Sequence, residues 1–314
     1  MRKLISVLTV IALSFSLVAL PASAAGEDKV VAKGVDVSYV QGNDINWEKV
    51  KAAGYSFAIL RISYSTKHAL DTSFEINYQN AKAAGVHVGC YMYSYAITEA
   101  QAIEDANEVI GWLKDKQLEY PIYYDMEDKK LLNNGLSTEQ RTKIALAFVK
   151  TLQASGYYAG VYANLNWFTN YLNLTEIQAV CDTWIAHSTS GKDYSDSHGM
   201  WQHSQTGTVD GIKGNVDLDV CYRDYPTIIK NGMYNGFERE IIYAEPSGIR
   251  GDVDGNGIRD LVDVVTLAQY VAGWSGLTVV EQELNADRDE DNVVGLPDVI
   301  YLAQSVAGWY PEET

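Results

Sequence analysis

The feature that most constrains this chain is an alternation of short apolar, β-rich runs with helical patterns over its N-terminal half. The β-rich runs lie at residues 34–38, 57–63, 86–95, 121–127 and 158–162. The helical patterns between them lie at residues 46–53, 74–84, 99–116 and 137–155. Such alternation predicts parallel strands that are joined by crossover helices.

The alternation of β-rich runs and helical patterns ends after Asp182. Three further β-rich runs, at residues 183–186, 200–204 and 216–221, are separated by spacers rich in Gly, Ser and Asp. These spacers are too polar and too broken for packed crossover helices. We therefore expect an α/β fold in which residues 33–230 form a TIM-like barrel of eight strands with about five helices, which follow only the first five strands.

The first residues have the pattern of an export signal. Arg2 and Lys3 precede an apolar run at residues 4–20, and Ala22-Ser23-Ala24 forms a small-x-small cleavage site. This predicts a signal peptide at residues 1–24 and a secreted, extracellular protein. An uncleaved membrane anchor is the alternative, but the run is short for a spanning helix and ends in a cleavage site.

The balance of charge narrows the range of partners. The formal net charge is −17. An acidic surface disfavours nucleic acid and anionic membranes. We therefore expect neither as a partner, and we expect any cell-wall substrate to be bound by stacking and hydrogen bonds in a cleft.

Three cysteines, Cys90, Cys181 and Cys221, leave at least one free thiol in a secreted chain. Cys90 lies in an apolar run and is expected to be buried. Spacing alone leaves a Cys181–Cys221 disulfide open.

The C-terminal part contains an internal repeat that follows a short tether at residues 231–250. Residues 252–257 recur at residues 287–292, and residues 267–274 recur at residues 302–309. Two copies at a fixed period of 35 residues predict two copies of one supersecondary unit.

Each repeat opens with a twelve-residue loop that has the ligand spacing of a calcium site. Hard divalent cations take six to eight oxygens, and alternate side chains of a tight loop can converge on one ion. The sequence therefore predicts two structural Ca²⁺ ions, the second bound more weakly because Gly295 and Pro297 interrupt its loop. The expected ligands are Asp252, Asp254, Asn256, the carbonyl of Ile258, Asp260 and Asp263 in the first loop, and Asp287, Asp289, Asp291, the carbonyl of Val293 and Asp298 in the second.

A loop followed by a helix, twice, without an entering helix, resembles the dockerin family over residues 251–312. Asp at the twelfth loop position, where calmodulin-like loops have Glu, fits this resemblance. It implies a small all-α module that binds a cohesin module on a scaffolding protein. By the same resemblance, exposed residues just after the ligands, among them Leu261, Val262 and Leu296, set the choice of partner.

Two carboxylates end the fourth β-rich run, in Tyr124-Asp125-Met126-Glu127. Alternate side chains of a strand share a face, so Asp125 and Glu127 point the same way and Met126 points toward the helices. Active sites of such barrels lie at the C-terminal ends of their strands. A carboxyl pair there suits glycoside cleavage, in which one acid protonates the leaving oxygen.

Two more acids, Asp36 and Asp217, lie at the ends of the first and eighth runs, which are neighbours in a closed barrel. We therefore expect four carboxylates to face one cleft. Taken singly, each could instead be a solvated side chain or the cap of a turn. Aromatic residues at similar strand ends are candidates for stacking on sugar rings, or for plain barrel filling: Tyr91, Tyr93, Tyr95, Tyr162, Trp184 and Trp201.

With these motifs the chain resembles the lysozymes of glycoside hydrolase family 25 over about residues 33–225. The motifs are Gly34-Val35-Asp36-Val37-Ser38, Gly89-x-Tyr91, Tyr124-Asp125-Met126-Glu127, Gly160-Val161-Tyr162, Trp184-Ile185-Ala186, Trp201-Gln202 and Val216-Asp217-Leu218. The sequence departs from the family pattern at Met92, where histidine is common, and at His203, where tyrosine is common.

The resemblance implies hydrolysis of the β-1,4 bond between N-acetylmuramic acid and N-acetylglucosamine in peptidoglycan, without a metal in catalysis. Glu127 would be the general acid, and Asp125 would stabilise developing positive charge or orient the acetamido group. Asp36 and Asp217 would position and polarise. The alternatives are a chitinase or other N-acetylhexosamine glycosidase, and a non-catalytic wall-binding module.

Overall fold

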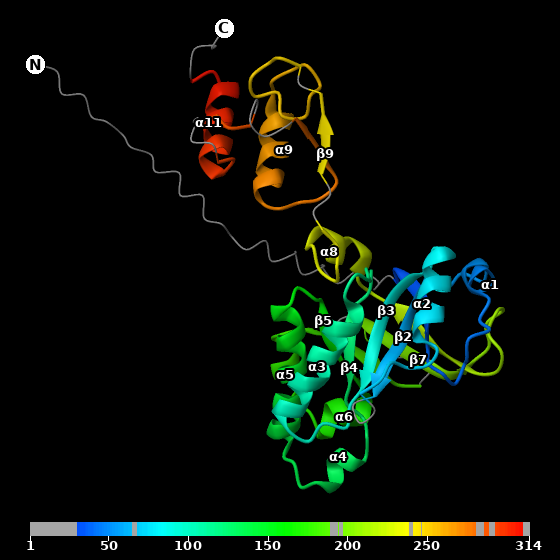
Figure 1. Cartoon of the computed structure of the whole chain (residues 1–314). Coiled ribbons are helices and arrows are strands. Elements are labelled where there is room, and N and C mark those ends of the chain that lie inside the picture. Colours follow the sequence, from blue (N-terminus) through cyan, green and yellow to red (C-terminus); the bar gives the residue numbers. More distant parts are fainter. Residues whose placement is uncertain are drawn as a thin grey trace, which may run out of the picture.

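The computed structural model describes residues 30–64, 68–188, 194, 197–238, 241–245, 247–280, 286–288 and 293–309. The signal peptide expected at residues 1–24 lies outside them. A barrel with its helices forms the larger body, and the C-terminal region lies beyond one of its ends (Figure 1). None of the helices in the described ranges has the length and apolar character needed to cross a bilayer.

Eight strands close the barrel in chain order, as the sequence predicts. They are β1 (Ala32–Val37), β2 (Phe57–Tyr64), β3 (His87–Tyr93), β4 (Ile122–Asp125), β5 (Ala159–Asn164), β6 (Asp182–Ala186), β7 (Met200–Gly207) and β8 (Val216–Cys221). Strands β1 to β7 are parallel to their neighbours, whereas β8 is antiparallel to both β7 and β1. The expectation of parallel strands is therefore wrong for β8. The segment 208–215 between β7 and β8 is too short for the crossover that a parallel connection needs.

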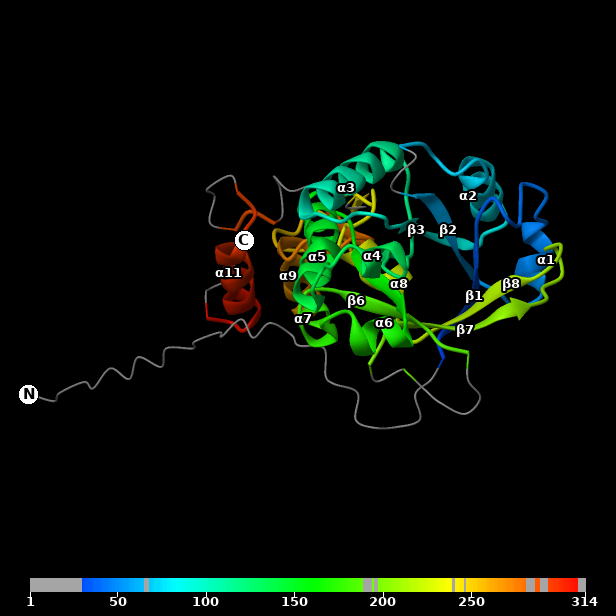
Figure 2. The same ribbon diagram turned by 90° about the horizontal axis from the view of Figure 1, so that it is seen from below.

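Helices follow the first five strands, as predicted, but one also follows β8, so the expectation that helices follow only the first five strands is wrong. They are also more numerous than about five. They are α1 (Trp47–Ala52), α2 (Phe74–Ala83), α3 (Glu99–Leu113), α4 (Lys130–Asn133), α5 (Thr138–Ala154), α6 (Leu165–Asn170) and α7 (Leu174–Gln178), with α8 (Tyr225–Asn231) after β8. The additional ones are single-turn or two-turn helices whose periodicity is too short to recognise in sequence. Helices α3, α5 and α7 lie along one flank of the barrel (Figure 2).

Two apolar layers hold the barrel together because side chains alternate along each strand. One layer fills the barrel interior and includes Phe57, Tyr123 and Trp184. The other lies between the strands and the helices and includes Tyr124 and Met126. Met126 thus points toward the helices, as predicted.

All three cysteines are free, so the disulfide left open by the sequence is not formed. Cys181 precedes β6 and Cys221 ends β8, with β7 between these strands. Two strand spacings place them about 9–10 Å apart across the sheet. That separation exceeds the usual Cα–Cα range of a disulfide. Cys90 is buried, as expected.

The first part of the expected tether belongs to the barrel. Asn235 has φ 56°, is fully buried, and donates to the carbonyl oxygens of Leu118 (3.1 Å) and Tyr120 (3.0 Å). Its side-chain oxygen accepts a hydrogen bond from the Tyr158 N–H at 2.7 Å. The predicted boundary at residue 230 is therefore too early, because this side chain satisfies backbone groups at the entrances of β4 and β5.

The C-terminal region consists of α9 (Leu261–Val271) and α11 (Leu296–Val306), which pack around a small core that includes Val253, Leu267 and Leu302. The region also contains a two-stranded parallel sheet of β9 (Ile241–Ala244) and β10 (Leu277–Val280). The prediction of an all-α module is therefore wrong, and part of the expected tether is a strand. Both strands are runs of only four mostly apolar residues, and periodicity alone cannot tell such a run from part of a buried helix.

Candidate active site

Four predicted carboxylates meet at one end of the barrel. Asp36 is near the end of β1, Asp125 ends β4, and Glu127 follows two residues later. Asp217 lies opposite Asp36 in the β1–β8 register. It lies at the start of β8, and it reaches this end of the barrel because β8 is antiparallel. The structure therefore brings the four carboxyl groups together, although the direction expected for β8 was wrong.

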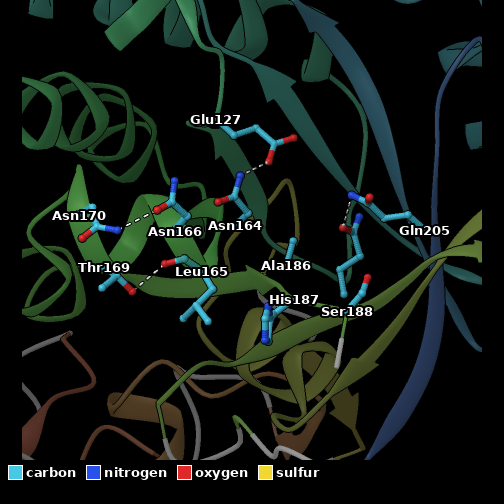
Figure 3. A pocket seen from close by; sticks show the side chains of 11 residues that line it. Glu127, Asn164, Leu165, Asn166, Thr169, Asn170, Ala186, His187, Ser188 and Gln205 are labelled. Carbon is cyan, nitrogen blue, oxygen red and sulfur yellow. Dashed lines mark hydrogen bonds between the residues drawn. The ribbon is translucent and has the colours of Figure 1, made fainter. Parts of the chain in front are cut away.

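Glu127 and Asp217 are half-buried, and Glu127 borders a cavity. Its Oε2 accepts a hydrogen bond from Asn164 Nδ2 at 3.0 Å (Figure 3). Burial raises the pKa of Glu127, the Asn164 hydrogen bond acts against this, and the charge of Asp128 adds to it. A carboxyl group with a raised pKa beside a cavity is suited to donating a proton.

Asp125 is more deeply placed and only 3% exposed. Burial, followed by the charges of Glu127 and Asp36, raises its pKa well above the usual range, while Arg61 acts in the opposite direction. Arg61 is itself paired with Asp71, with Nη2 and Oδ2 2.7 Å apart. The cluster is therefore poorly neutralised by cations, and protons must offset part of its charge.

Gln202 bridges the carboxylates of β1 and β8. Its Nε2 donates to Asp36 Oδ2 at 2.7 Å and to Asp217 Oδ2 at 3.3 Å, and its Oε1 accepts from the Tyr162 hydroxyl at 3.1 Å. Burial is the main reason why the pKa of Asp217 rises to about 6. Burial and the charge of Asp217 raise the pKa of Asp36 further. Gln202 was not predicted as a site residue, although it stands beside Trp201 in a motif that the sequence analysis used.

Asp219 is a fifth carboxyl group that the sequence analysis missed. It is fully buried in the barrel, and its Oδ1 accepts a hydrogen bond from Trp184 Nε1 at 3.0 Å. Burial and then the charges of Asp36 and Asp217 raise its pKa well above the usual range. The available signal was its spacing of two residues from Asp217, which puts both side chains on the inner face of β8.

Two of the six predicted stacking residues are placed differently. Trp184 is 1% exposed and packs on Tyr162, with ring centroids 4.4 Å apart, so it fills the barrel. Trp201 points outward, where its Nε1 donates to the His187 carbonyl and its ring packs on Tyr194. The prediction that these two tryptophans stack on sugar rings is therefore wrong. A position at a strand end does not determine how deeply a side chain is buried or which face of the sheet it occupies.

The other four predicted stacking residues are tyrosines, and they lie on the expected face of the sheet. Tyr93 and Tyr95 are half-buried, with ring centroids 5.2 Å apart, and the Tyr93 hydroxyl donates to Asp128 Oδ2 at 3.1 Å. Tyr91 is partly buried, and Tyr162 is 5% exposed with its hydroxyl on Gln202. Tyr93 and Tyr95 thus retain the ring surface that a sugar could contact.

A cavity of about 550 Å³ lies beside Glu127 and Gln202. Its other described lining residues come from the end of β5, α6, the end of β6 and β7, and include no carboxylate, lysine or arginine (Figure 3). The lining residues there are Asn164, Leu165, Asn166, Thr169, Asn170, Ala186, His187, Ser188 and Gln205. Amides and hydroxyl groups beside a single acid suit an uncharged polar ligand.

The first C-terminal loop brings three predicted ligands together. Carboxylate oxygens of Asp252, Asp254 and Asp263 all lie within 4.8 Å of one another. Asn256 lies beside them, with its Nδ2 2.9 Å from Asp254 Oδ2. Asp260 caps α9 instead, accepting from the Val262 N–H at 2.7 Å.

Other ligands are less well defined. Ile258 is 62% exposed and Val293 is 63% exposed, and Asp289 and Asp291 lie outside the described residues. In the second loop Asp287 is partly buried and Asp298 is fully buried.

The two loops share a hydrogen-bond pattern. Asp263 accepts from the N–H groups of Val253 and Asp260, both at 2.7 Å. Asp298 accepts from the N–H groups of Arg288 and Gly295, at 2.6 and 2.7 Å. The same sequence offsets recur, so the repeat in the sequence corresponds to a repeat in the structure.

Comparison with known proteins places the barrel in a family. Residues 35–212 match the family model described as glycosyl hydrolases family 25. The chain is 31% identical over 196 residues to lysozyme M1 of Streptomyces globisporus, covering 59% of this chain and 66% of that protein. It is 27% identical over 188 residues to an autolytic lysozyme of Clostridium acetobutylicum, covering 60% and 55%. The chain thus spans between 55% and 66% of the length of these two relatives.

Solved structures give the same picture of the barrel. The bacterial lysozyme from Streptomyces coelicolor has a TM-score of 0.53 and 28% identity, covering 60% of this chain and 90% of that one. The modular autolysin LytC from Streptococcus pneumoniae has a TM-score of 0.54 and 28% identity, covering 60% and 46%.

Proposed function

The chain belongs to glycosyl hydrolases family 25, and from this premise we propose that it is a secreted muramidase that hydrolyses the glycan strands of peptidoglycan. The bond cut is the β-1,4 linkage between N-acetylmuramic acid and N-acetylglucosamine. The similarity to the lysozymes of Streptomyces globisporus and Clostridium acetobutylicum supports this substrate class.

One observation carries the proposal: Glu127 combines a raised pKa with access to the cavity. Its proton goes to the glycosidic oxygen as the bond from the sugar carbon breaks, and water finally supplies the hydroxyl group on that carbon. Asn164 orients the Glu127 carboxyl group through its 3.0 Å hydrogen bond. The amide-rich wall fits an N-acetylated sugar on the leaving side.

The deeper carboxyl groups act on the other half of the substrate. Asp125 faces the developing positive charge or the acetamido group, and Gln202 fixes the mutual orientation of Asp36 and Asp217. An oxocarbenium-like transition state is stabilised by negative charge held nearby. Tyr93 and Tyr95 supply ring surface against which the glycan can stack.

Mass spectrometry of fragments from purified peptidoglycan tests the choice of bond. The new reducing ends are reduced with borohydride and identified. Muramitol at these ends supports the proposal, and glucosaminitol alone would indicate a glucosaminidase. Activity on chitin with none on peptidoglycan would favour a chitinase, and binding without cleavage would favour a wall-binding module.

For the C-terminal region we propose a dockerin that binds two structural Ca²⁺ ions and docks to a cohesin module. The donor set of the first loop fits a hard cation, since Asp252, Asp254 and Asp263 converge within 4.8 Å. Asp252 and Asp263 are fully buried, and burying carboxylates is costly unless their charge is offset. A bound cation would offset the repulsion among these oxygens.

Exposed apolar residues support the partner. Leu261 and Val262 are 66% and 53% exposed at the start of α9, and Leu296 is 45% exposed at the start of α11. Apolar side chains displayed on a helix suit a protein surface. Calcium-dependent capture on a panel of immobilised cohesin modules tests this proposal, and no capture by any of them would contradict it.

Secretion has its own test. N-terminal sequencing of the protein from culture medium should give a chain that begins at Ala25, after the small-x-small site. A mature chain that still carries residues 1–24 would contradict the export proposal.

A further inference from the structure

Asp219 lies one layer beneath the carboxylates that face the cleft. In the sheet register it is opposite Gly34 of β1 and Gln202 of β7, whereas Asp217 is opposite Asp36. Asp219 is fully buried, and Trp184 Nε1 donates to its Oδ1 at 3.0 Å. Its Oδ2 is also buried and accepts no hydrogen bond from any donor group of the described residues.

The surroundings of Asp219 contain acids and neutral groups. Asp36 faces it from β1, and Asp217 and the thiol of Cys221 face it from its own strand. Trp184 of β6 and Gln202 of β7 are its uncharged neighbours. None of these groups is basic, so an ionised Asp219 would have one donor and no counter-charge. A buried carboxyl group in this position is far more stable when protonated.

A proton on Oδ2 would have an acceptor. Asp36 is the diagonal neighbour of Asp219 across the β1–β8 register, on the same inner face of the barrel, so its carboxylate can serve as this acceptor. The directions of the pKa shifts agree, since Asp219 lowers the pKa of Asp36 and Asp36 raises that of Asp219. Asp36 is in turn directly opposite Asp217, and Gln202 Nε2 donates to both carboxyl groups, at 2.7 and 3.3 Å. The three groups thus form a chain from the barrel interior to the cleft.

We propose that Asp219 is a positioning residue that stays protonated and donates its O–H to Asp36, so that the negative charge of the Asp219–Asp36–Asp217 chain lies at the cleft end. This rests on the proposed hydrolase function. The raised pKa of Asp219, caused by burial and then by Asp36 and Asp217, agrees with it. Asp219 touches no substrate and acts through Asp36.

Two substitutions separate the proposal from its alternatives. Asp219→Asn keeps an acceptor for Trp184 and replaces the O–H with an N–H donor, so the pH profile and turnover should stay close to those of the parent. Asp219→Ala removes the donor, which should lower kcat roughly 10-fold, the equivalent of one hydrogen bond, with less change in KM. The acid limb of its profile should move to higher pH, because the Asp36–Asp217 pair loses a donor that stabilises its negative charge.

Other outcomes of the same two substitutions would overturn the proposal. If both variants move the acid limb to lower pH, Asp219 is ionised in the parent and the proposal is overturned. If both lose turnover to the same extent with an unmoved profile, or neither changes, Asp219 has no role beyond packing. Asp44→Asn, at a side chain that is 85% exposed, is the matched control.

Infrared difference spectroscopy gives a readout that needs neither activity nor a folded alanine variant. The spectrum of the parent minus that of Asp219→Asn should show the carbonyl band of one protonated carboxyl group. Loss of a carboxylate band instead would overturn the proposal. Because the band is independent of turnover, it decides the state of Asp219 even if the protein fails to cleave peptidoglycan.

Discussion

The barrel cleft and the first C-terminal loop both crowd carboxylates together, but different donors hold them. In the cleft the donors are side chains: Gln202 for Asp36 and Asp217, and Asn164 for Glu127. In the loop they are mainly backbone N–H groups, such as those of Val253, Asp254 and Asp260 that donate to Asp263.

The difference shows two ways of managing repulsion between like charges. Deep burial in the cleft raises pKa values, so that protons remove charge and become available for chemistry. Backbone donors in the loop act against the rise in the pKa of Asp263 that burial causes, and this favours carboxylates that can receive a cation. One cluster is suited to moving protons and the other to holding a metal ion.

The largest expected effect is a loss of turnover in the cleft that leaves the C-terminal loop unchanged. Glu127→Gln keeps the shape of the side chain but has no proton to donate, so turnover on peptidoglycan should fall by roughly 10²–10⁴. The same substitution at Glu139, which is 71% exposed on α5, is the control and should have no effect. Near-normal turnover by a folded Glu127→Gln protein would remove Glu127 from its proposed role.

Chelation tests the other side of the comparison. With EDTA we expect the C-terminal region to unfold and cohesin capture to fail, while cleavage of soluble glycan fragments persists. A ligand present at about 1,000 times its Kd contributes about 4 kcal/mol to the folded state, which is large for so small a core. Limited proteolysis and cleavage are measured on one sample.

Asp254→Asn should weaken this calcium response, whereas Asp210→Asn, on an exposed barrel side chain, should leave it unchanged. Simultaneous loss of capture and cleavage would mean that calcium also supports the barrel. Loss of neither would mean that the loops are not structural calcium sites.

A smaller effect sharpens the role of side-chain donors in the cleft. Asn164→Ser keeps a cap for α6, whose first turn Asn164 holds through the Trp167 N–H, but removes the donor to Glu127. The pKa of Glu127 should rise, by roughly one unit at most, since one hydrogen bond to its charged form is lost. A general acid works while protonated, so the alkaline limb of kcat/KM should move to higher pH. Asn166→Ser, in the same cavity wall, is the control, and an equal shift there would contradict the assignment.

The smallest effect concerns stability. The pKa of Asp217 is raised to about 6, chiefly by burial, so the folded state binds its proton more tightly than the unfolded state does. Its contribution to stability is therefore greatest below about pH 4 and is lost as the pH rises to about 6. Asp217→Asn should raise the thermal midpoint by roughly 2–4 °C at pH 7 and by less at pH 4. An equal change at both values, or a change that Asp44→Asn reproduces, would speak against this linkage.

Much of the barrel could be predicted because its strands and longer helices differ in period. Asp125 and Glu127 share a face for the same reason, and Met126 lies on the other. The direction of β8 could not be read from its residues, because a strand of alternating side chains has the same pattern in either direction. The tryptophans failed for a related reason: Trp184 and Trp201 are both at strand ends, but only the register shows that one is deep and the other faces outward.

The remaining omissions depend on distant partners. Gln202 and Asn235 matter because of atoms more than a hundred residues away, Asp36 Oδ2 for one and the Leu118 carbonyl for the other. Nothing near them in the sequence marks these contacts. Likewise, β9 is defined only by β10, with which it pairs.

The reversed direction of β8 also decides how the enzyme can approach a solid substrate. Because β8 starts beside the cleft, the chain leaves the barrel at the opposite end, where α8 and Asn235 lie, and the C-terminal region continues from there (Figure 1). A parallel last strand would have released the chain at the rim of the cleft, in the path of the incoming glycan. If the C-terminal region docks to a scaffold, as proposed, the barrel would be held at the end opposite the cleft, and the cleft would face away from the scaffold.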